Sequence, residues 1–245
     1  MTAPPAARWP AAASWMARRR AGWGLPVAGA VAFRYACFVG MLALSLWGEG
    51  RPAPHLPDLV LDHLPYVGLV DRYNHWLLTL AYIPLALALL AVDWRRFVRY
   101  NVTSGLLSLA RGVCIAVTGL GPVRGPDVHA GLFFDAGGRP RTDFWQALGE
   151  LSTPGGLFGK DAAHVYLTKD LFFSGHTGVT FLLLLYLWQK RRLRWLMLVG
   201  HLLVVASVLL AHLHYTIDII GAYAIAFSLY VLREGWPPRR GLAAG

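Results

Sequence analysis

Three ionisable side chains stand where two apolar segments begin, and together they could transfer a phosphoryl group or a proton. His176 lies shortly after Lys169 and Asp170, near the start of one apolar segment. His214 opens the last apolar segment, and Asp218 follows it by four residues, between two isoleucines. A carboxylate at such a position is costly in a membrane and is a candidate functional residue by default. In a helix, positions 214 and 218 would share one face.

These residue types suit covalent catalysis at phosphorus. Histidine titrates near neutral pH, so one ring can attack phosphorus while another passes protons. We expect His214 to be the nucleophile. Asp218 would hold its imidazole in one tautomer and stabilise the positive charge, as the acid does in a Ser-His-Asp triad. His176 would protonate the departing alcohol. A single histidine at a span boundary is more often a helix cap, but two histidines and a membrane Asp at one depth favour catalysis.

The composition is typical of a membrane protein. Of 245 residues, 56% are hydrophobic and only 15% are charged, which leaves no room for a separate soluble domain. We expect one catalytic membrane domain at 26–233, between a basic N-terminus at 1–25 and a basic tail at 234–245. Cys37 and Cys114 both fall inside expected spans, so neither a disulfide framework nor a cysteine metal site is expected.

Hydropathy predicts an all-α membrane protein with six transmembrane helices. Each apolar segment is close to the roughly 20 residues needed to cross a bilayer. The expected spans lie at about 27–48, 75–93, 102–121, 171–188, 195–212 and 214–232. The long connection 122–168 is rich in glycine, proline and aromatic residues, and we expect a short interfacial helix within it, from Phe144 to Leu151.

The distribution of basic residues predicts the orientation. The net charge is +10, and arginines cluster in the expected loops 94–99 and 189–194 and after residue 233. By the positive-inside rule, these loops and both termini face the cytoplasm. This charge is thus explained by topology and does not indicate nucleic-acid binding. The two histidines and Asp218 then meet on the outer side, periplasmic or lumenal, at one depth.

Two arginines lie within expected spans. Arg34 is interpreted as paired or snorkelling, with its charged head drawn toward the interface. Arg111, near the middle of the third span, is either structural or faces a lipid phosphate, and the sequence favours neither alternative.

Two motifs resemble those of a known family. Residues 170–177 (DLFFSGHT) and 212–223 (HLHYTIDIIGAY) resemble the third and fourth motifs of the sphingomyelin synthase family. Weaker matches to the first two motifs precede them in the right order: Leu56-Pro-Asp58 with Asp62 and Leu64-Pro65, then Arg111-Gly-Val-Cys-Ile with Thr118. The matches are spread over residues 56–223.

The resemblance implies a six-span enzyme with a helical core like that of type-2 phosphatidic acid phosphatases. Such enzymes move phosphocholine or phosphoethanolamine from a glycerophospholipid to ceramide and release diacylglycerol. It assigns His214 as the attacking histidine that forms a phosphohistidine, Asp218 as its partner, and His176 as the acid/base. Asp170 would orient His176 or contact the head group. No metal or cofactor is expected.

The resemblance also indicates candidates for substrate binding. Lys169 stands beside Thr168 where the family has Cys-Gly, and its charge could alter head-group selection. Some members use a further Glu in the long outer loop, for which Glu150 is a candidate. The remaining candidates are Ser174, Arg111, Tyr215 and His212. The expected partners are membrane lipids, a glycerophospholipid donor and a ceramide or diacylglycerol acceptor, and a homo-oligomer is left open.

The alternative functions make different demands on charge. A lipid phosphatase or phospholipase C-like hydrolase is the second interpretation. Phosphatases of this type carry a Ser-Arg pair that appears here as Ser207-Val208, so a bidentate phosphate donor is missing. A phosphodiester carries one negative charge and a monoester nearly two, so the less cationic site suits the diester. A transporter would need ionisable residues throughout the membrane depth, whereas here they cluster at one face apart from Arg34 and Arg111.

Overall fold

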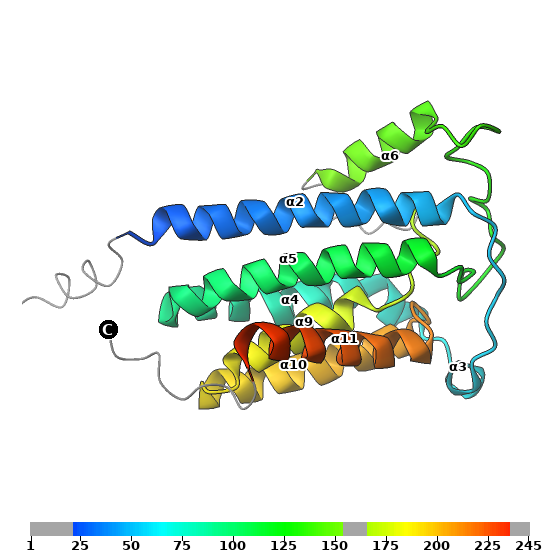
Figure 1. The fold of residues 1–245 in the computed structure, drawn as a ribbon. Coiled ribbons are helices and arrows are strands. Elements are labelled where there is room, and N and C mark those ends of the chain that lie inside the picture. Colours follow the sequence, from blue (N-terminus) through cyan, green and yellow to red (C-terminus); the bar gives the residue numbers. More distant parts are fainter. Residues whose placement is uncertain (1–21, 154–165, 236–245) are drawn as a thin grey trace, which may run out of the picture.

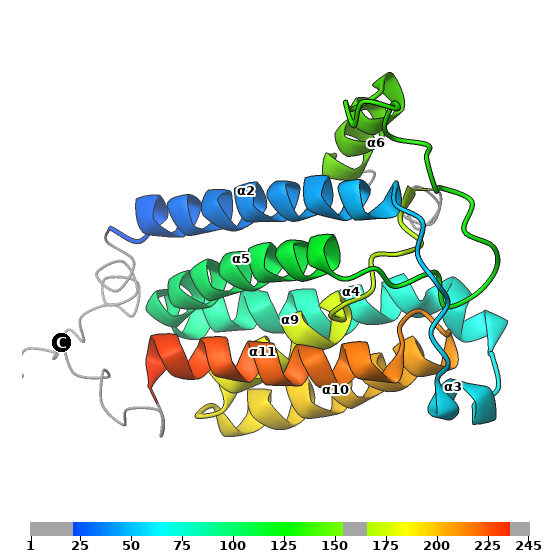
Figure 2. The same cartoon turned by 45° about the vertical axis from the view of Figure 1, so that its right-hand side comes forward.

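The chain folds as a bundle of helices. The computed structural model describes residues 22–153 and 166–235, where the one β pairing is an isolated bridge between Phe134 and Pro140. Six helices run alongside one another (Figures 1 and 2): α2 (Gly24–Glu49), α4 (Gly68–Val92), α5 (Trp94–Val117), α9 (Gly175–Leu187), α10 (Arg191–Leu210) and α11 (Thr216–Glu234). Two shorter helices are α3 (Leu59–His63) and α6 (Thr142–Ser152). The predicted all-α architecture is confirmed for the described residues.

Five helices in the described ranges are long and apolar enough to cross a membrane: α2, α4, α5, α10 and α11. α9 has only 13 residues, fewer than the roughly 20 of a full crossing. The predicted span 171–188 is therefore helical only from Gly175 to Leu187. Before Gly175 the backbone is irregular, because the carbonyls of Asp170 and Phe173 accept hydrogen bonds from the Arg111 side chain and are satisfied without a helix.

The two basic segments predicted as loops are largely helical. Residues 94–99 form the start of α5, and α4 and α5 are joined by Asp93 alone. The Asp93 carboxylate accepts a hydrogen bond from the Arg96 amide at 3.1 Å and pairs with its side chain at 3.2 Å. This N-cap satisfies orphan amides and offsets the unfavourable arginines near a helix N-terminus. All three arginines in 189–194 belong to the first turn of α10, which has no side-chain cap.

α9 lies at the centre of the bundle. It contacts α4, α5, α10 and α11, and its residues from Leu182 to Leu187 are buried. α2 packs against α5, and the crossing is close because a Cβ on Gly112 would lie 2.9 Å from the Met41 Cα. Small residues allow such approaches between membrane helices. The helix that carries His176 is thus held on several sides.

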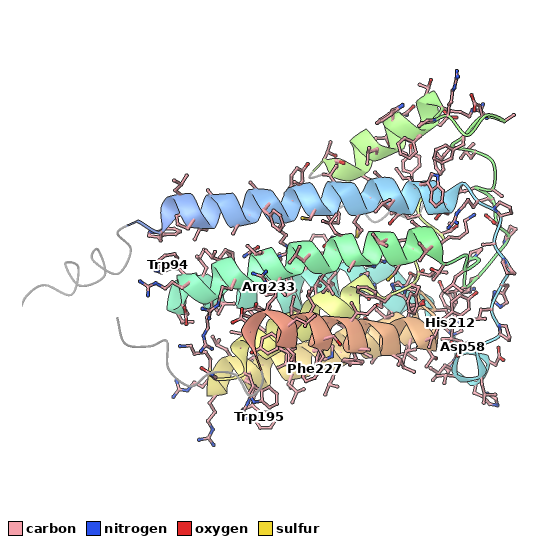
Figure 3. The ribbon with its side chains drawn as sticks, in the orientation of Figure 1. Asp58, Trp94, Trp195, His212, Phe227 and Arg233 are labelled. Atoms are coloured by element: carbon pink, nitrogen blue, oxygen red, sulfur yellow. The ribbon has the colours of Figure 1, made fainter. Side chains whose placement is uncertain are left out.

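The two ends of the bundle differ. α3, α6 and the long loop after α5 gather at one end, and the α4–α5 and α9–α10 turns lie at the other (Figure 1). Asp58 and His212 lie at the first end and Trp94 and Trp195 at the opposite one (Figure 3). α6 confirms the helix predicted from Phe144 to Leu151, and it packs on α2.

Candidate active site

The turn between α10 and α11 presents His214. α10 ends with a residue in the left-handed region, His212, at φ 49°. The amide of His212 donates to the Leu209 carbonyl at 3.0 Å, and that of Leu213 donates to the Val208 carbonyl at 3.1 Å. These bonds form a Schellman motif, which satisfies the last carbonyls of a helix. His212 therefore serves to end α10, and its ring contacts the Leu64 carbonyl at 3.1 Å.

The first turn of α11 places a carboxylate against His214. Asp218 is fully buried, and its Oδ2 accepts a hydrogen bond from the Tyr215 amide at 2.9 Å. The same oxygen lies 3.3 Å from Nδ1 of His214, whose side chain is only 5% exposed. Because a carboxylate accepts, Nδ1 carries the proton and Nε2 keeps the lone pair of a nucleophile. The 3.3 Å separation is slightly longer than a typical hydrogen bond.

His176 lies in the first turn of α9 and faces His214. Ser174 caps this helix by accepting from the Thr177 amide at 3.4 Å, and its own amide donates to the Asp218 carbonyl at 3.0 Å. The two imidazole rings are 6.2 Å apart between centroids, with an interplanar angle of 66°. Reacting atoms come within about 3–3.5 Å in a productive complex. A phosphoryl group placed between the rings could therefore contact both.

Arg111 supports the loop that leads to His176. Its guanidinium donates to the carbonyls of Phe173 at 2.6 Å and Asp170 at 2.8 Å, and pairs with the Asp170 carboxylate at 2.8 Å. Ser45 also donates to that carboxylate at 3.1 Å. A Cβ on Gly175 would lie 3.2 Å from the guanidinium carbon, so this glycine permits the close contact. These contacts fix the guanidinium to the loop between Asp170 and Phe173, which supports the structural alternative for this arginine.

Lys169 contacts the outer loops. Its ammonium donates to the Arg51 carbonyl and to the Asp127 carboxylate, both at 2.7 Å, and the residue is 4% exposed. Two protein oxygens therefore bind this cation, and the prediction that its charge alters head-group selection stays a prediction.

Glu49, at the end of α2, was not among the predicted site residues. Its buried carboxylate accepts hydrogen bonds from the amides of Thr168 at 2.8 Å and Lys169 at 2.7 Å, and from the Thr168 hydroxyl. His129 contacts the same carboxylate at 2.8 Å. Glu49 thus joins the end of α2 to the loop segment that precedes Asp170. The one signal in the sequence is an acidic residue at the end of an apolar segment.

The other predicted residues have separate positions. Tyr215 is buried, and its hydroxyl donates to the Gly121 carbonyl and accepts from the Leu56 amide, both at 3.1 Å, so it joins α11 to two outer loops. Glu150 is exposed on α6, where it accepts from Gln146 at 3.1 Å. Within the described residues, no group of three or more His, Cys, Asp or Glu side chains is placed to hold a metal ion.

Asp58 joins two helix N-termini near the site. Its carboxylate accepts hydrogen bonds from the Thr216 amide at 2.5 Å and hydroxyl at 2.9 Å, and it caps α3 through the amides of Val60 and Leu61. Burial alone would raise the pKa of this carboxyl, but the hydrogen bonds from Thr216, Leu61 and Val60 outweigh it and lower the pKa below its ordinary value. The ionised form of Asp58 therefore stabilises the start of α11.

We expect Asp58→Asn to lower Tm by about 3–6 °C at pH 7, because charge-assisted hydrogen bonds are stronger than neutral ones. A lowered pKa stabilises the fold above the unfolded pKa of about 3.9, and this contribution is lost as the pH falls through the folded value. The gap in Tm between wild type and variant should therefore narrow below pH 4. Thermal unfolding in nanodiscs at several pH values would measure it, and a gap that does not change with pH would contradict the assignment.

Comparison with known proteins agrees with this geometry. A family model described as PAP2 superfamily matches residues 56–232. The chain is 32% identical over 221 residues to phosphatidylcholine:ceramide cholinephosphotransferase 2 of Rattus norvegicus, and 32% identical over 216 residues to the Mus musculus protein of that name. Each alignment covers 81% of this chain and 57% of the relative, so the chain spans just over half the length of these relatives. These matches confirm the resemblance predicted from the motifs around His176 and His214. Because the family model matches most of its length, the chain belongs to the PAP2 superfamily.

Proposed function

We propose that this protein is a phospholipid head-group transferase that moves phosphocholine from a glycerophospholipid to ceramide, with phosphoethanolamine as an alternative head group. The observation that carries the proposal is that the ring centroids of His176 and His214 lie 6.2 Å apart and that Asp218 contacts His214, at one end of an apolar bundle. The similarity to ceramide cholinephosphotransferases supports the choice of substrates.

In the first half-reaction, Nε2 of His214 attacks the phosphorus of the donor lipid. An N–P bond forms as the bond from phosphorus to the glycerol oxygen breaks. His176, protonated, gives its proton to that oxygen, and diacylglycerol leaves. Asp218 stabilises the positive charge that develops on the His214 ring, since its carboxylate contacts Nδ1.

In the second half-reaction, the primary hydroxyl of ceramide attacks the phosphohistidine. His176, now neutral, removes the hydroxyl proton as the new O–P bond forms. The N–P bond breaks, and its electron pair returns to Nε2 of His214, which has kept its proton on Nδ1. The same two histidines therefore serve both halves, each returning to its starting protonation state.

We assign Arg111 and Asp170 to positioning. Their ion pair and the two carbonyl contacts hold the loop that ends at Ser174, from which α9 and His176 begin. Lys169 and Glu49 hold the start of the same loop. Because Arg111 and Lys169 are each paired with a carboxylate, their charges are partly neutralised, which suits a phosphodiester with one negative charge.

The site is further proposed to lie on the outer side of a six-span protein with both termini in the cytoplasm. The arginine-rich starts of α5 and α10 lie at the end opposite His212 (Figure 3), and by the positive-inside rule we expect that end to face the cytoplasm. α9, although short, would complete the sixth crossing together with the loop that precedes it.

This orientation predicts the accessibility of engineered cysteines. In a chain with Cys37 and Cys114 replaced by alanine, Val128→Cys should react with a membrane-impermeant thiol reagent in intact cells, because Val128 is 63% exposed on the long loop. Arg192→Cys, at the other end, should react only after the cells are opened. The reverse pattern would contradict both the orientation and the outer position of the site.

The reaction itself is tested by a side-by-side assay of purified protein at matched surface concentrations of lipid. One arm contains phosphatidylcholine or phosphatidylethanolamine with ceramide, and the other contains phosphatidic acid. We expect diacylglycerol and a new phosphosphingolipid in equal amounts in the first arm, and little phosphate release in the second. Faster phosphate release, with no sphingolipid product for either head group, would instead support a lipid phosphatase.

A further inference from the structure

Three polar side chains meet inside the bundle, each from a different helix. His201 of α10 is 2% exposed, and its Nδ1 lies 2.8 Å from the hydroxyl of Thr180 on α9. Its Nε2 lies 2.7 Å from the hydroxyl of Tyr223 on α11. Phe181 covers the group, with ring centroids 5.8 Å from His201 and 4.8 Å from Tyr223. An ionisable residue in such a position within membrane helices requires a functional explanation.

The contacts define where each proton lies. The Thr180 hydroxyl has a carbonyl acceptor at 2.7 Å, the oxygen of His176. If it donates there, Nδ1 of His201 must carry a proton and donate to Thr180. Nε2 is then an acceptor, and the Tyr223 hydroxyl donates to it. The reverse order would leave the Tyr223 proton without an acceptor among the described residues, so the first arrangement satisfies more groups.

This row of hydrogen bonds ends on the backbone of His176. The first turn of α9 is attached to α11 at two levels. At the N-terminal end of α9, the Ser174 amide donates to the Asp218 carbonyl at 3.0 Å. Further along α9, Thr180 is linked to Tyr223 by two hydrogen bonds through the His201 ring. Because α9 has only 13 residues, it has little other length with which to hold His176 against His214.

We propose that His201 is a positioning residue that sets the depth and rotation of His176 relative to His214. The proposal rests on the catalytic role proposed for His176. Interhelical hydrogen bonds in membranes add little to stability on average, so stability alone is a weak reason for a buried histidine. A displacement of about 1 Å at a reacting group can instead lower a rate about 100-fold.

Kinetics of four variants in nanodiscs test the proposal, with rates expressed per folded protein. His201→Leu and Thr180→Val should each lower kcat about 10- to 100-fold with KM for the donor lipid nearly unchanged. His201→Gln should restore most of the rate, because an amide presents one donor and one acceptor. Tyr223→Phe should give a smaller loss, since the Thr180 contact is kept.

A matched control comes from the other end of α9. Tyr186 makes an interhelical hydrogen bond to Thr103 of α5 at 2.8 Å, far from His176 along the helix. Tyr186→Phe is chemically identical to Tyr223→Phe and should lower thermal stability without lowering kcat. Equal kcat losses in these two variants, or an unchanged kcat in folded His201→Leu, would overturn the proposal. If His201→Leu does not fold, the nearly isosteric Thr180→Val decides between the same outcomes.

A second measurement is independent of the reaction. In protein labelled with ¹⁵N-histidine, the His201 signals, identified by their loss in His201→Gln, should show a neutral ring protonated at Nδ1 from pH 6 to 8. Thr180→Val should shift the His176 signals, and Tyr186→Phe should not. The other tautomer at His201, or unshifted His176 signals, would overturn the positioning role even in an active enzyme. If the NMR signals behave as expected but the wild-type protein shows no transfer activity, only the proposed function is contradicted.

Discussion

His214→Ala is expected to lower turnover by about 10⁴-fold or more, the largest effect of any single substitution in this chain. The variant removes the atom that forms the covalent bond to phosphorus. Neither His176 nor Asp218 can replace it, because His176 lies across the site and Asp218 is fully buried behind the ring. The measurement is the initial rate of diacylglycerol release from labelled phospholipid, with and without ceramide.

The matched control lies two residues away. His212 ends α10 in the left-handed region, where glycine is favourable, so His212→Gly should fold and keep most of its activity. Rapid quenching of the wild type with a head-group-labelled donor and no ceramide should give a labelled protein that releases the label in acid, as a phosphohistidine does. A folded His214→Ala protein with near-normal turnover would show that the covalent mechanism is wrong.

Residue types and spacing were sufficient to predict that His176, His214 and Asp218 lie together, and to predict most helices. His214 and Asp218 were expected to share one face of a helix; they do contact each other, but His214 lies before α11, which begins at Thr216, and the turn leading into that helix brings its ring to Asp218. Hydropathy located the spans because lipid-facing helices are apolar over their whole length. It missed the start of α5, since arginines lower the local hydropathy although an N-cap at Asp93 allows the helix to begin there.

The contacts of the supporting residues could not be predicted, because their partners are distant in the chain. Glu49 contacts Thr168 and Lys169 across about 120 residues, and Arg111 contacts Asp170 across about 60. The sequence left open whether Arg111 and Lys169 contact the protein or the lipid, and it gave no partner for Glu49. Only the folded arrangement shows that Lys169 is bound by Asp127 and that Arg111 is bound by the loop beneath His176.

Asp218→Asn should preserve the fold and yet slow turnover by about 10²–10⁴-fold. In the structure, Oδ2 of Asp218 accepts from the Tyr215 amide and contacts His214, whereas the buried Oδ1 has no hydrogen-bond partner in the described part of the chain. An asparagine can place its oxygen at the Oδ2 position and keep the helix cap at Tyr215. Its amide group then replaces Oδ1, where no bond is lost.

What the asparagine removes is the negative charge. His214 gains positive charge as it attacks phosphorus, and a buried carboxylate 3.3 Å from Nδ1 stabilises that charge far better than a neutral amide. An asparagine turned the other way would present its NH₂ to His214 and favour the tautomer that protonates Nε2, the attacking atom. Both orientations lower kcat, but only the first keeps the cap on Tyr215 and leaves Tm close to the wild-type value, because the same oxygen position contacts both His214 and the Tyr215 amide. Asp218→Ala is the contrasting variant, because it also loses the cap on Tyr215 and should lower both. Equal turnover in wild type and Asp218→Asn would show that the His214 ring needs no charged partner, and that Asp218 serves only to begin α11.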